Sequence, residues 1–556
     1  MRKKRILWVN EASWKGTGYG TYGNEILTRL HKVEEFEIAE LACYIDRDDP
    51  EINKRPWKVY ANRPLESDPE FSTYVSHPSR VFGEQTFNHV LIDFMPDIVM
   101  DIRDWWMFEF EQRSPFRDFF HWAIMPTVDA MPQNGQWMNT FSDADSVFAY
   151  SEFGKQTLLN QSDQINFIDI ASPAAGAAFK PVKDKAAHKD AMGLDPDSVI
   201  IGTVMRNQRR KLYPDLFKAF RKFLDSTKRS NVFLYCHKYY PDIGWETPEL
   251  LDKFGLNNRV LFTYRCSDCK SVSVDFYKDV VCYCEKCKTL SKRLAGVDNS
   301  INDEELNKVY NLFDMYVQYA NSEGFGMPQL EAAYCGLPVV SVNYSAMESV
   351  IKNIGAISIE PIALSMECET GCYRAMPDNN QLVEIIKSYT PSNTINQTNI
   401  ARAVGLKEIG QRSEKLAREY YNWDKTAQVW IDHFKTIPMK DINETWLSPI
   451  NIKEPNTQMP TGMTELVDQV DFIFSNILHK PEWIGGYFWG KVIKDITFGY
   501  RVYNAEDDYY YNESHLPKVE KYQKFNMLNA VEELINMRRL WNDYEKLRGK
   551  INAARV

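Results

Sequence analysis

The sequence predicts an α/β fold with two doubly wound, mostly parallel sheets, and two segments support this prediction most directly. Residues 5–30 have the pattern of a short apolar strand, a glycine-rich loop and a helix, and residues 315–342 repeat that pattern. Short apolar strands that alternate with amphipathic helices are typical of parallel sheets covered by helices on both faces. With 556 residues, of which 44% are hydrophobic, the chain can form two or three cores.

The N-terminal glycine loop follows the strand predicted at residues 5–10. Gly18, Gly20 and Gly23 have the spacing G-x-G-x-x-G, and Asp46 follows the next strand. On its own this pattern suggests a dinucleotide-binding fold, so an NAD-dependent oxidoreductase is one alternative. The motif is short, and the second half of the chain carries more specific signals.

A basic turn follows a buried strand that starts at Val199. Arg206 stands at the end of that strand, Lys211 stands five residues later, and an amphipathic helix follows. Arg209 and Arg210 lie in the same turn, and charges in such a turn are usually solvated. Each charge-assisted hydrogen bond to a phosphate contributes about 1.5 to 3 kcal/mol, so cations at a strand end can hold a diphosphate.

Two glutamates, Glu323 and Glu331, flank a glycine turn after the strand predicted at residues 315–319. The glycines permit a tight turn with accessible amide groups, and Pro328 suits the first turn of a helix, where Glu331 would lie. In a doubly wound sheet such loops face the ligand crevice. Carboxylates are good acceptors for pairs of sugar hydroxyls, so we expect a ligand with hydroxyls on both sides of its phosphates.

The stretch "EGFGMPQLEAAYCGLPVV" resembles the E-x7-E signature of glycosyltransferase family 4. Members of this family are retaining nucleotide-sugar enzymes with the GT-B architecture, in which two Rossmann-like domains face each other across a cleft. The resemblance extends to the closing helices around "SEKLAREYYNWDKTAQVWIDHF" and leaves the last hundred or so residues uncovered. It implies a UDP-sugar, or another nucleotide-sugar, as donor.

The resemblance also implies roles for single residues. Glu331 would bind the ribose hydroxyls, Arg206 and Lys211 would hold the two phosphates, and Glu323 with the following turn would hold the transferred sugar. The donor-binding set that it implies is Gly18, Gly20, Arg206, Lys211, Glu323, Phe325, Gly326, Met327 and Glu331. The catalytic set is Arg206, Lys211, Glu323 and Asp129.

Asp129 is a candidate for the acceptor side of the cleft. The segment around it is similar to a family 4 subset, and the residues that carry this likeness are Asp129, Pro132, Trp137, Ser151 and Phe153. Many family members have a histidine directly before this aspartate, whereas this chain has Val128. An acid at a strand end can equally cap the next turn, so both roles remain open for Asp129.

A cysteine pattern that the family does not share stands between the strand at "RVLFTY" and the helix near Asp303. Two C-x2-C pairs separated by fourteen residues are formed by Cys266, Cys269, Cys284 and Cys287, and Cys282 is a spare. This spacing predicts a structural Zn²⁺ site in a zinc ribbon at residues 264–293, with a closed set of four thiolates. The ribbon carries seven Lys or Arg against four Asp or Glu, so a contact with nucleic acid, a contact with another protein and a purely structural role all remain open.

The sequence divides into four parts. We expect an N-terminal acceptor-side domain at residues 1–180, a nucleotide-sugar domain at 181–437 that contains the ribbon, and a mainly helical extension at 438–556. The formal net charge of −10 disfavours indiscriminate binding to nucleic acid or membranes. No run of residues has the pattern of a signal peptide or a membrane span, and zinc thiolates need a reducing compartment, so we expect a cytoplasmic protein.

The leading hypothesis is therefore a retaining transferase that moves a sugar from a nucleotide-diphosphate donor to a hydroxyl of a glycan, lipid or protein. The mechanism implied by the resemblance uses the leaving phosphate as proton acceptor, so no catalytic metal is expected. One alternative acceptor is a hydroxylated nucleic-acid base. A non-catalytic zinc-ribbon binding protein on a transferase scaffold is the alternative from another class.

Overall fold

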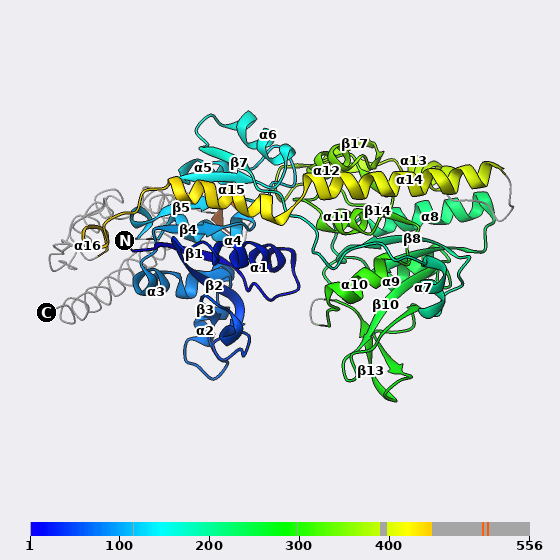
Figure 1. Ribbon diagram of the computed structural model, residues 1–556, viewed down its shortest axis with the longest axis horizontal. Helices are drawn as coiled ribbons and strands as arrows, with labels where there is room; N and C mark the ends of the chain where they lie inside the picture. Colours follow the sequence, from blue (N-terminus) through cyan, green and yellow to red (C-terminus); the bar gives the residue numbers. More distant parts are fainter. Residues whose placement is uncertain are drawn as a thin grey trace.

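In the computed structural model the chain forms two α/β lobes joined along one edge by long helices (Figure 1). The structure describes residues 2–114, 116–296, 299–389 and 397–446, together with the short strands β19 (Tyr503–Asn504) and β20 (Tyr509–Tyr510). Most of the mainly helical extension predicted at residues 438–556 lies outside the described residues.

The first lobe contains a sheet of seven parallel strands in the order β3-β2-β1-β4-β5-β6-β7. The strands are β1 (Lys4–Glu11), β2 (Phe36–Asp46), β3 (Lys58–Arg63), β4 (Ile98–Asp101), β5 (His121–Ile124), β6 (Ser146–Ala149) and β7 (Phe167–Ile170). The helices of this lobe are α1 (Gly18–Leu30), α2 (Phe71–Val75), α3 (Gln85–Phe94), α4 (Trp105–Gln112), α5 (Gly135–Asp143) and α6 (Glu152–Gln161), with short turns at Ile52–Lys54, Arg80–Glu84 and Arg117–Phe119.

The second lobe contains a parallel sheet in the order β10-β9-β8-β14-β15-β16. These strands are β8 (Val199–Val204), β9 (Val232–His237), β10 (Val260–Cys266), β14 (Met315–Gln318), β15 (Val339–Val342) and β16 (Ile357–Ile359). The helices are α7 (Lys185–Ala191), α8 (Tyr213–Thr227), α9 (Thr247–Lys253), α10 (Asp303–Tyr310), α11 (Met327–Tyr334), α12 (Ala346–Ile354) and α13 (Asn379–Tyr389). Both predicted doubly wound sheets are thus present.

The second lobe has two antiparallel additions, of which the first extends its sheet and the second forms a separate two-stranded sheet. The cysteine ribbon, residues 264–293, continues from β10 through β11 (Val272–Phe276), β12 (Val281–Cys284) and β13 (Thr289–Leu294), and it projects from the lower edge of the lobe in Figure 1. A hairpin of β17 (Pro361–Met366) and β18 (Tyr373–Pro377) follows β16. The sequence did not lead us to expect this hairpin.

The order of the strands locates the ligand crevice. Along the chain β8 is followed by β9 on one side, whereas β14 lies on its other side, so the connections diverge between β8 and β14. Ligands of open α/β sheets bind at this divergence, beyond the carboxyl ends of the strands. The basic turn follows β8 and the Glu323 loop follows β14, so both meet at this point.

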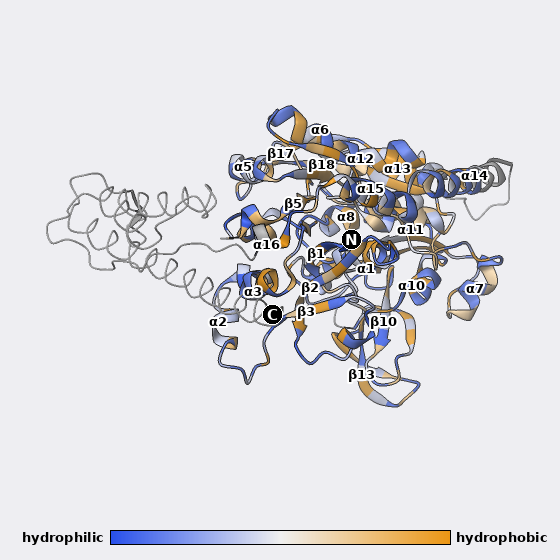
Figure 2. Cartoon of the chain, turned by 60° about the vertical axis from the view of Figure 1, so that its left-hand side comes forward, coloured by the Kyte–Doolittle hydropathy of each residue, from blue (hydrophilic) through white to orange (hydrophobic). Residues whose placement is uncertain are grey.

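Amphipathic helices cover the sheets. In α8 the apolar face is buried, as predicted, and its members are Leu216, Phe217, Phe220 and Leu224. Figure 2 shows α6 and α13 with hydrophobic and hydrophilic residues side by side along each helix. Such a helix gains most of its stability from tertiary packing of the apolar face.

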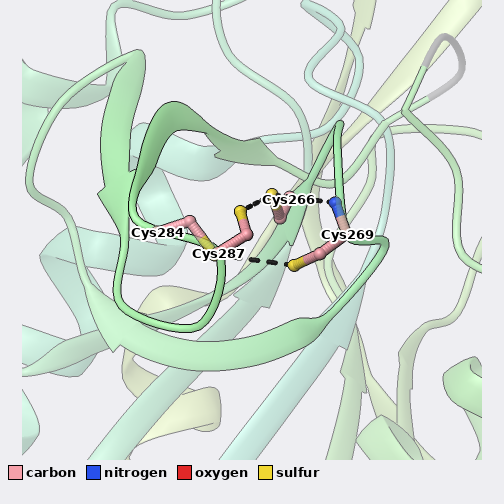
Figure 3. A group of neighbouring side chains, drawn as sticks. All are labelled: Cys266, Cys269, Cys284 and Cys287. Carbon is pink, nitrogen blue, oxygen red and sulfur yellow. Dashed lines mark hydrogen bonds between the residues drawn. The ribbon is translucent and has the colours of Figure 1, made fainter.

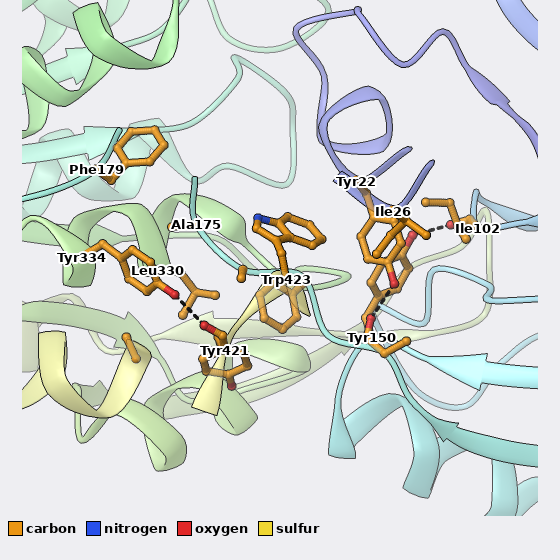
Figure 4. Packing of buried hydrophobic residues seen from close by; sticks show 14 of the residues in the cluster. Tyr22, Ile26, Ile102, Tyr150, Ala175, Phe179, Leu330, Tyr334, Tyr421 and Trp423 are labelled. Carbon is orange, nitrogen blue, oxygen red and sulfur yellow. Dashed lines mark hydrogen bonds between the residues drawn. The ribbon is translucent and has the colours of Figure 1, made fainter. Parts of the chain in front are cut away.

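The last described helices, α14 (Gln397–Tyr420), α15 (Trp423–Thr436) and α16 (Ile442–Thr445), run from the second lobe back to the first (Figure 1). The indole of Trp430 in α15 donates a hydrogen bond to the Tyr22 hydroxyl at 2.8 Å, and the rings of Trp423 and Tyr22 meet edge to face at 5.3 Å. Figure 4 shows one apolar cluster that continues from Tyr22 and Tyr150 to Tyr421 and neighbours in the second lobe. The two lobes therefore share a core.

Candidate active site and metal centre

Glu323 is the centre of the candidate active site. Its side chain is only 5% exposed and accepts hydrogen bonds from Lys211, Arg210 and Gln318. Its main-chain amide donates to the Ser345 hydroxyl at 2.9 Å, which fixes the loop against the start of α12. Burial alone would raise the pKa of Glu323, but the charges of Arg210 and Lys211 lower it to about 2.

The basic turn is held against the Glu323 loop by main-chain contacts. Lys211 forms a bridge with Ala320, and the amide of Asn321 donates to the Arg210 carbonyl at 2.9 Å. Lys211 is 7% exposed, and burial together with the neighbouring Arg210 lowers its pKa to about 8. Two cations therefore share one carboxylate, so the three charges together retain one positive charge that can bind an anion.

Arg206, the predicted partner of Lys211 at the phosphates, contacts neither Lys211 nor Glu323 in any hydrogen bond or ion pair of the described residues, and its role stays a prediction. Its side chain is 50% exposed and forms a bidentate ion pair with Asp242, in which Nε and Nη2 of Arg206 each lie 3.0 Å from a carboxylate oxygen. Arg210, which we expected to be solvated, contacts Glu323 instead and also donates to the Ser322 carbonyl at 3.0 Å. No local signal separates Arg210 from Arg209, because its partners lie 112 and 113 residues further along the chain.

Glu331 lies on the other side of the turn. Helix α11 begins at Met327 after Gly326, which has a φ of +86°, so Glu331 falls just beyond the first turn in which we expected it. A glycine is required at 326 because side chains rarely adopt this conformation. The Tyr310 hydroxyl donates to Glu331 at 2.6 Å, and burial raises the pKa of this carboxyl to about 7 although the Tyr310 bond opposes the shift.

The remaining predicted donor residues of this loop are held by packing. The ring of Phe325 is buried and meets Tyr421 edge to face at 5.5 Å, and Met327 is half-buried against the same cluster. The side chains of Phe325 and Met327 therefore support the loop. At Phe325, the main chain is the part that a ligand can contact.

The first lobe supplies the opposite wall of the cleft. Asp129 pairs with Arg374 of the hairpin at 2.8 Å and accepts a hydrogen bond from Ser322 at 3.3 Å, so it reaches across to the second lobe. Gly324 approaches Thr127 so closely that a side chain at 324 would collide with the Thr127 methyl group. The structure thus brings Asp129 to the same loop as Glu323.

Asp104 is a member of this wall that the sequence did not reveal. It is half-buried and hydrogen-bonded to Tyr19, whose hydroxyl also lies 2.8 Å from Thr127. Burial and the negative charge of Asp129 raise the pKa of Asp104 to about 7, while Arg210 across the cleft opposes this shift. Asp104 follows a strand end, and that position is the only signal that could have indicated it.

The glycine loop lies at the start of α1. Thr17 caps this helix by accepting the amide of Gly20 at 3.1 Å, and a side chain at Gly20 would collide with main-chain oxygens of Lys15 and Ala12. Gly18 is the first residue of α1, and open space surrounds the position of a side chain there. The loop is thus a compact helix start, and its part in donor binding stays a prediction.

The four predicted metal ligands come together in the cysteine ribbon (Figure 3). The sulfur atoms of Cys266, Cys269, Cys284 and Cys287 all lie within 4.8 Å of one another, with 3.5 Å between Cys266 and Cys287 and 3.7 Å between Cys269 and Cys284. A tetrahedral ion with bonds of 2.3 Å to sulfur separates its ligands by about 3.8 Å, so the cluster could hold a metal.

Two further observations concern this cluster. Hydroxyl groups of Ser291, Ser271 and Thr289 lie 3.0 to 3.1 Å from its sulfur atoms, a position from which they can stabilise thiolates. The spare Cys282 lies outside the cluster, with its sulfur 3.4 Å from the Asp279 carbonyl. All ten cysteines belong to the described ranges and all of them are free of disulfide bonds.

None of the described helices combines the length and the apolar character that a membrane-spanning helix requires.

Known proteins resemble this chain at two levels. Residues 296–361, which include β14, α11 and both glutamates of the site, match the family model described as glycosyl transferases group 1. The serotype-specific mannosyltransferase WbdA of Escherichia coli is 23% identical over 218 residues, which cover 38% of this chain. The match spans only 22% of that relative's length.

Solved structures resemble the chain over a larger part of its length. Sucrose-phosphate synthase from Thermosynechococcus elongatus has a TM-score of 0.54 at 14% identity, with 78% of this chain and 98% of that one covered. Anabaena HepE in complex with UDP-glucose has a TM-score of 0.53 at 13% identity, with 78% and 99% covered. The chain therefore has the GT-B fold of two facing α/β lobes, and its residues 296–361 are similar to group 1 glycosyl transferases.

Proposed function

We propose that this protein is a retaining glycosyltransferase of the family 4 type, which transfers a sugar from a nucleotide-diphosphate donor to a hydroxyl group of an acceptor. The observation that supports this most strongly is the convergence of Lys211 and Arg210 on the buried Glu323 at the divergence of β8 and β14. The acceptor hydroxyl belongs to a glycan, a lipid or a protein.

The charges of the site match the parts of such a donor. When a diphosphate enters, Lys211 and Arg210 can donate to its oxygens while Glu323 accepts from hydroxyls of the transferred sugar. Glu331 stands on the next helix, where an ionised carboxylate can accept both ribose hydroxyls. Arg206 is half-exposed while it is paired with the buried side chain of Asp242, so a phosphate can bind the open side of its guanidinium without breaking that pair.

The chemistry needs little beyond these groups. The bond between the anomeric carbon and the diphosphate breaks, the acceptor oxygen bonds to the same face of that carbon, and the hydroxyl proton passes to the departing phosphate. Preorganised donors at the leaving oxygens lower the barrier, and removal of one such donor commonly costs about 10² to 10³ in rate.

Uridine diphosphate is the nucleotide that we propose, because HepE is described in complexes with UDP and UDP-glucose. The test is incubation of the protein with UDP-, GDP- and ADP-sugars, followed by measurement of the released nucleotide. We expect slow hydrolysis of a UDP-sugar, and proton NMR of the transfer product should show an unchanged anomeric configuration.

A thermal-shift experiment distinguishes this function from an oxidoreductase. UDP at a hundred times its Kd should stabilise the fold by about 2.7 kcal/mol, whereas NAD should leave the Tm unchanged. Stabilisation by NAD alone, or hydrolysis of none of the nucleotide-sugars, would contradict the proposal.

We also propose that the cysteine cluster holds a structural Zn²⁺. Elemental analysis should find about one zinc per chain, because four thiolates in closed tetrahedral geometry are typical of structural zinc. Cys287→Ser should lose the metal and lower the Tm, since zinc binding contributes folding energy to such a ribbon. Cys282→Ser is the matched control, and equal zinc content in both variants would refute the site.

A further inference from the structure

Three tryptophans lie together on the first lobe, beside the wall of the cleft. Trp105 and Trp106 begin helix α4, and Trp137 stands in helix α5. The rings of Trp105 and Trp137 stack at 5.9 Å with 25° between their planes, and Trp106 meets Trp137 edge on at 6.3 Å. We call these residues the tryptophan cluster.

One tryptophan of the cluster is anchored to the protein by a hydrogen bond, and another is exposed to solvent. The Trp105 indole donates to the Thr140 hydroxyl at 2.9 Å, which anchors the stacked pair. Trp106 is 48% exposed, and Met131, in the loop between β5 and α5, is 42% exposed. Tryptophan is highly buried on average, so an exposed ring supported by two others is a surface prepared for contact.

This surface lies at the same edge of the first sheet as Asp104 and Asp129, because α4 and α5 begin beyond the carboxyl ends of the parallel strands β4 and β5. Asp104 directly precedes the two tryptophans of α4, and Asp129 lies in the loop that leads to α5. Asp104 occupies the N-cap position of α4, yet its carboxyl makes no capping hydrogen bond to the described residues of that helix. It faces the Tyr19 hydroxyl and, across the cleft, the charge of Arg210.

We propose that the tryptophan cluster and Asp104 form the acceptor subsite, and that the acceptor is a saccharide chain. This inference depends on the proposed transferase function and narrows its acceptor to one chemical class. A sugar ring has an apolar face of C–H groups, which packs on an aromatic ring, and a rim of hydroxyls, which donate to carboxylates.

The other acceptor classes fit this wall less well. Nucleic acid binds mainly through cations that neutralise phosphates, whereas the side chains that the first lobe contributes to this wall are the carboxylates Asp104 and Asp129, and the nearby Arg374 is already paired with Asp129. A lipid phosphate meets the same repulsion. The cysteine ribbon, in which Lys and Arg outnumber Asp and Glu, extends from a different part of the molecule (Figure 1).

The test measures transfer in the full-length protein with the nucleotide-sugar that it hydrolyses. The acceptor probe is a mixture of neutral gluco-, manno- and galacto-oligosaccharides of two to six units. In Trp106→Ala we expect the ratio of transfer to hydrolysis to fall about tenfold, the loss of one aromatic contact, and Trp106→Phe should recover part of it. The matched control is Tyr283→Ala on the ribbon, because Tyr283 is 49% exposed, and it should transfer like the unaltered protein.

Binding gives a second readout. The neutral oligosaccharides should change the tryptophan fluorescence of the unaltered protein and change it less in Trp106→Ala, and a twelve-residue single-stranded DNA should leave it unchanged. Equal transfer ratios in Trp106→Ala and the unaltered protein, or a loss in Tyr283→Ala instead, would overturn the subsite while nucleotide-sugar hydrolysis still upheld the transferase. Absence of all hydrolysis would overturn both.

Discussion

The two walls of the cleft differ in charge, burial and rigidity. On the second lobe, Lys211 and Glu323 are almost fully buried and bound to each other. On the first lobe, Asp104 and Asp129 are half-buried acids beside an exposed indole. A wall that binds diphosphate must be positive and preorganised before the ligand arrives, whereas a wall that binds an acceptor can remain open to solvent. The residues of the donor half are therefore more strongly constrained, by burial and by their ion pairs, than those of the acceptor half.

The largest effect should come from the cation of the donor wall. Lys211→Ala removes a desolvated positive charge that would stabilise the leaving diphosphate, so we expect transfer to fall at least about 100-fold. Measurement of kcat with a saturating donor checks this. Circular dichroism and the Tm must show a folded variant, and turnover within about twofold of the original would exclude Lys211 from the chemistry.

Substitutions in the buried donor wall should also cost more stability than those in the half-buried acceptor wall. Glu323→Gln leaves two neighbouring cations without their counter-ion, which we expect to cost about 3 kcal/mol in the free energy of unfolding near pH 7. The pKa of Glu323 is depressed to about 2, so its contribution is present above the ordinary value of 4.5 and is lost as pH falls toward 2. Urea unfolding at pH 7 and pH 3 should thus show a smaller difference at pH 3. Equal costs at both values would contradict the assigned ion pairs.

Glu331 should behave in the opposite sense. Its pKa is raised to about 7, so the folded protein holds a proton that the unfolded chain releases above about 4.5. Relative to Glu331→Gln, the unaltered protein should lose on the order of 1 to 3 kcal/mol between pH 5 and pH 8. Calorimetry of both proteins across this range tests the expectation. Tyr310→Phe is a useful companion, because loss of the hydrogen bond to Glu331 should raise this pKa further.

We expect the smallest effect on stability at the ion pair between Asp129 of the first lobe and Arg374 of the second. Asp129→Asn weakens the contact with Arg374, but Arg374 keeps its pair with Glu367 at 2.8 Å, so we expect a cost of about 1 kcal/mol or less. A double-mutant cycle with Arg374→Gln measures the coupling. A cost near that of Glu323→Gln would mean that the first wall is as rigid as the second, and the comparison would fail.

The sequence was informative where chemistry and local structure coincide. The glycine turn between Glu323 and Glu331, the helix after it and the four clustered cysteines follow from short-range rules on backbone conformation and ligand spacing. The two parallel sheets follow from the alternation of apolar strands and amphipathic helices. Each of these signals lies within a few tens of residues.

Other parts of the site depend on contacts between distant segments. Arg210 is distinguished from Arg209 only by a pairing with a loop more than a hundred residues away. The tryptophan cluster requires two helix starts to lie side by side, which the strand order decides. Asp104 is indistinguishable in sequence from an ordinary helix cap. Its pKa is raised by burial and by the neighbouring Asp129, and both of these causes depend on the folded structure.

Helix α15 comes last among the longer described helices, yet it packs on helix α1 of the first lobe through Trp430 and Tyr22. The surface of the first lobe that α15 covers therefore stays exposed until the ribosome has synthesised that helix, with the entire second lobe in between. We expect a fragment of the first lobe alone to gain stability when residues 423–436 are supplied as a separate peptide.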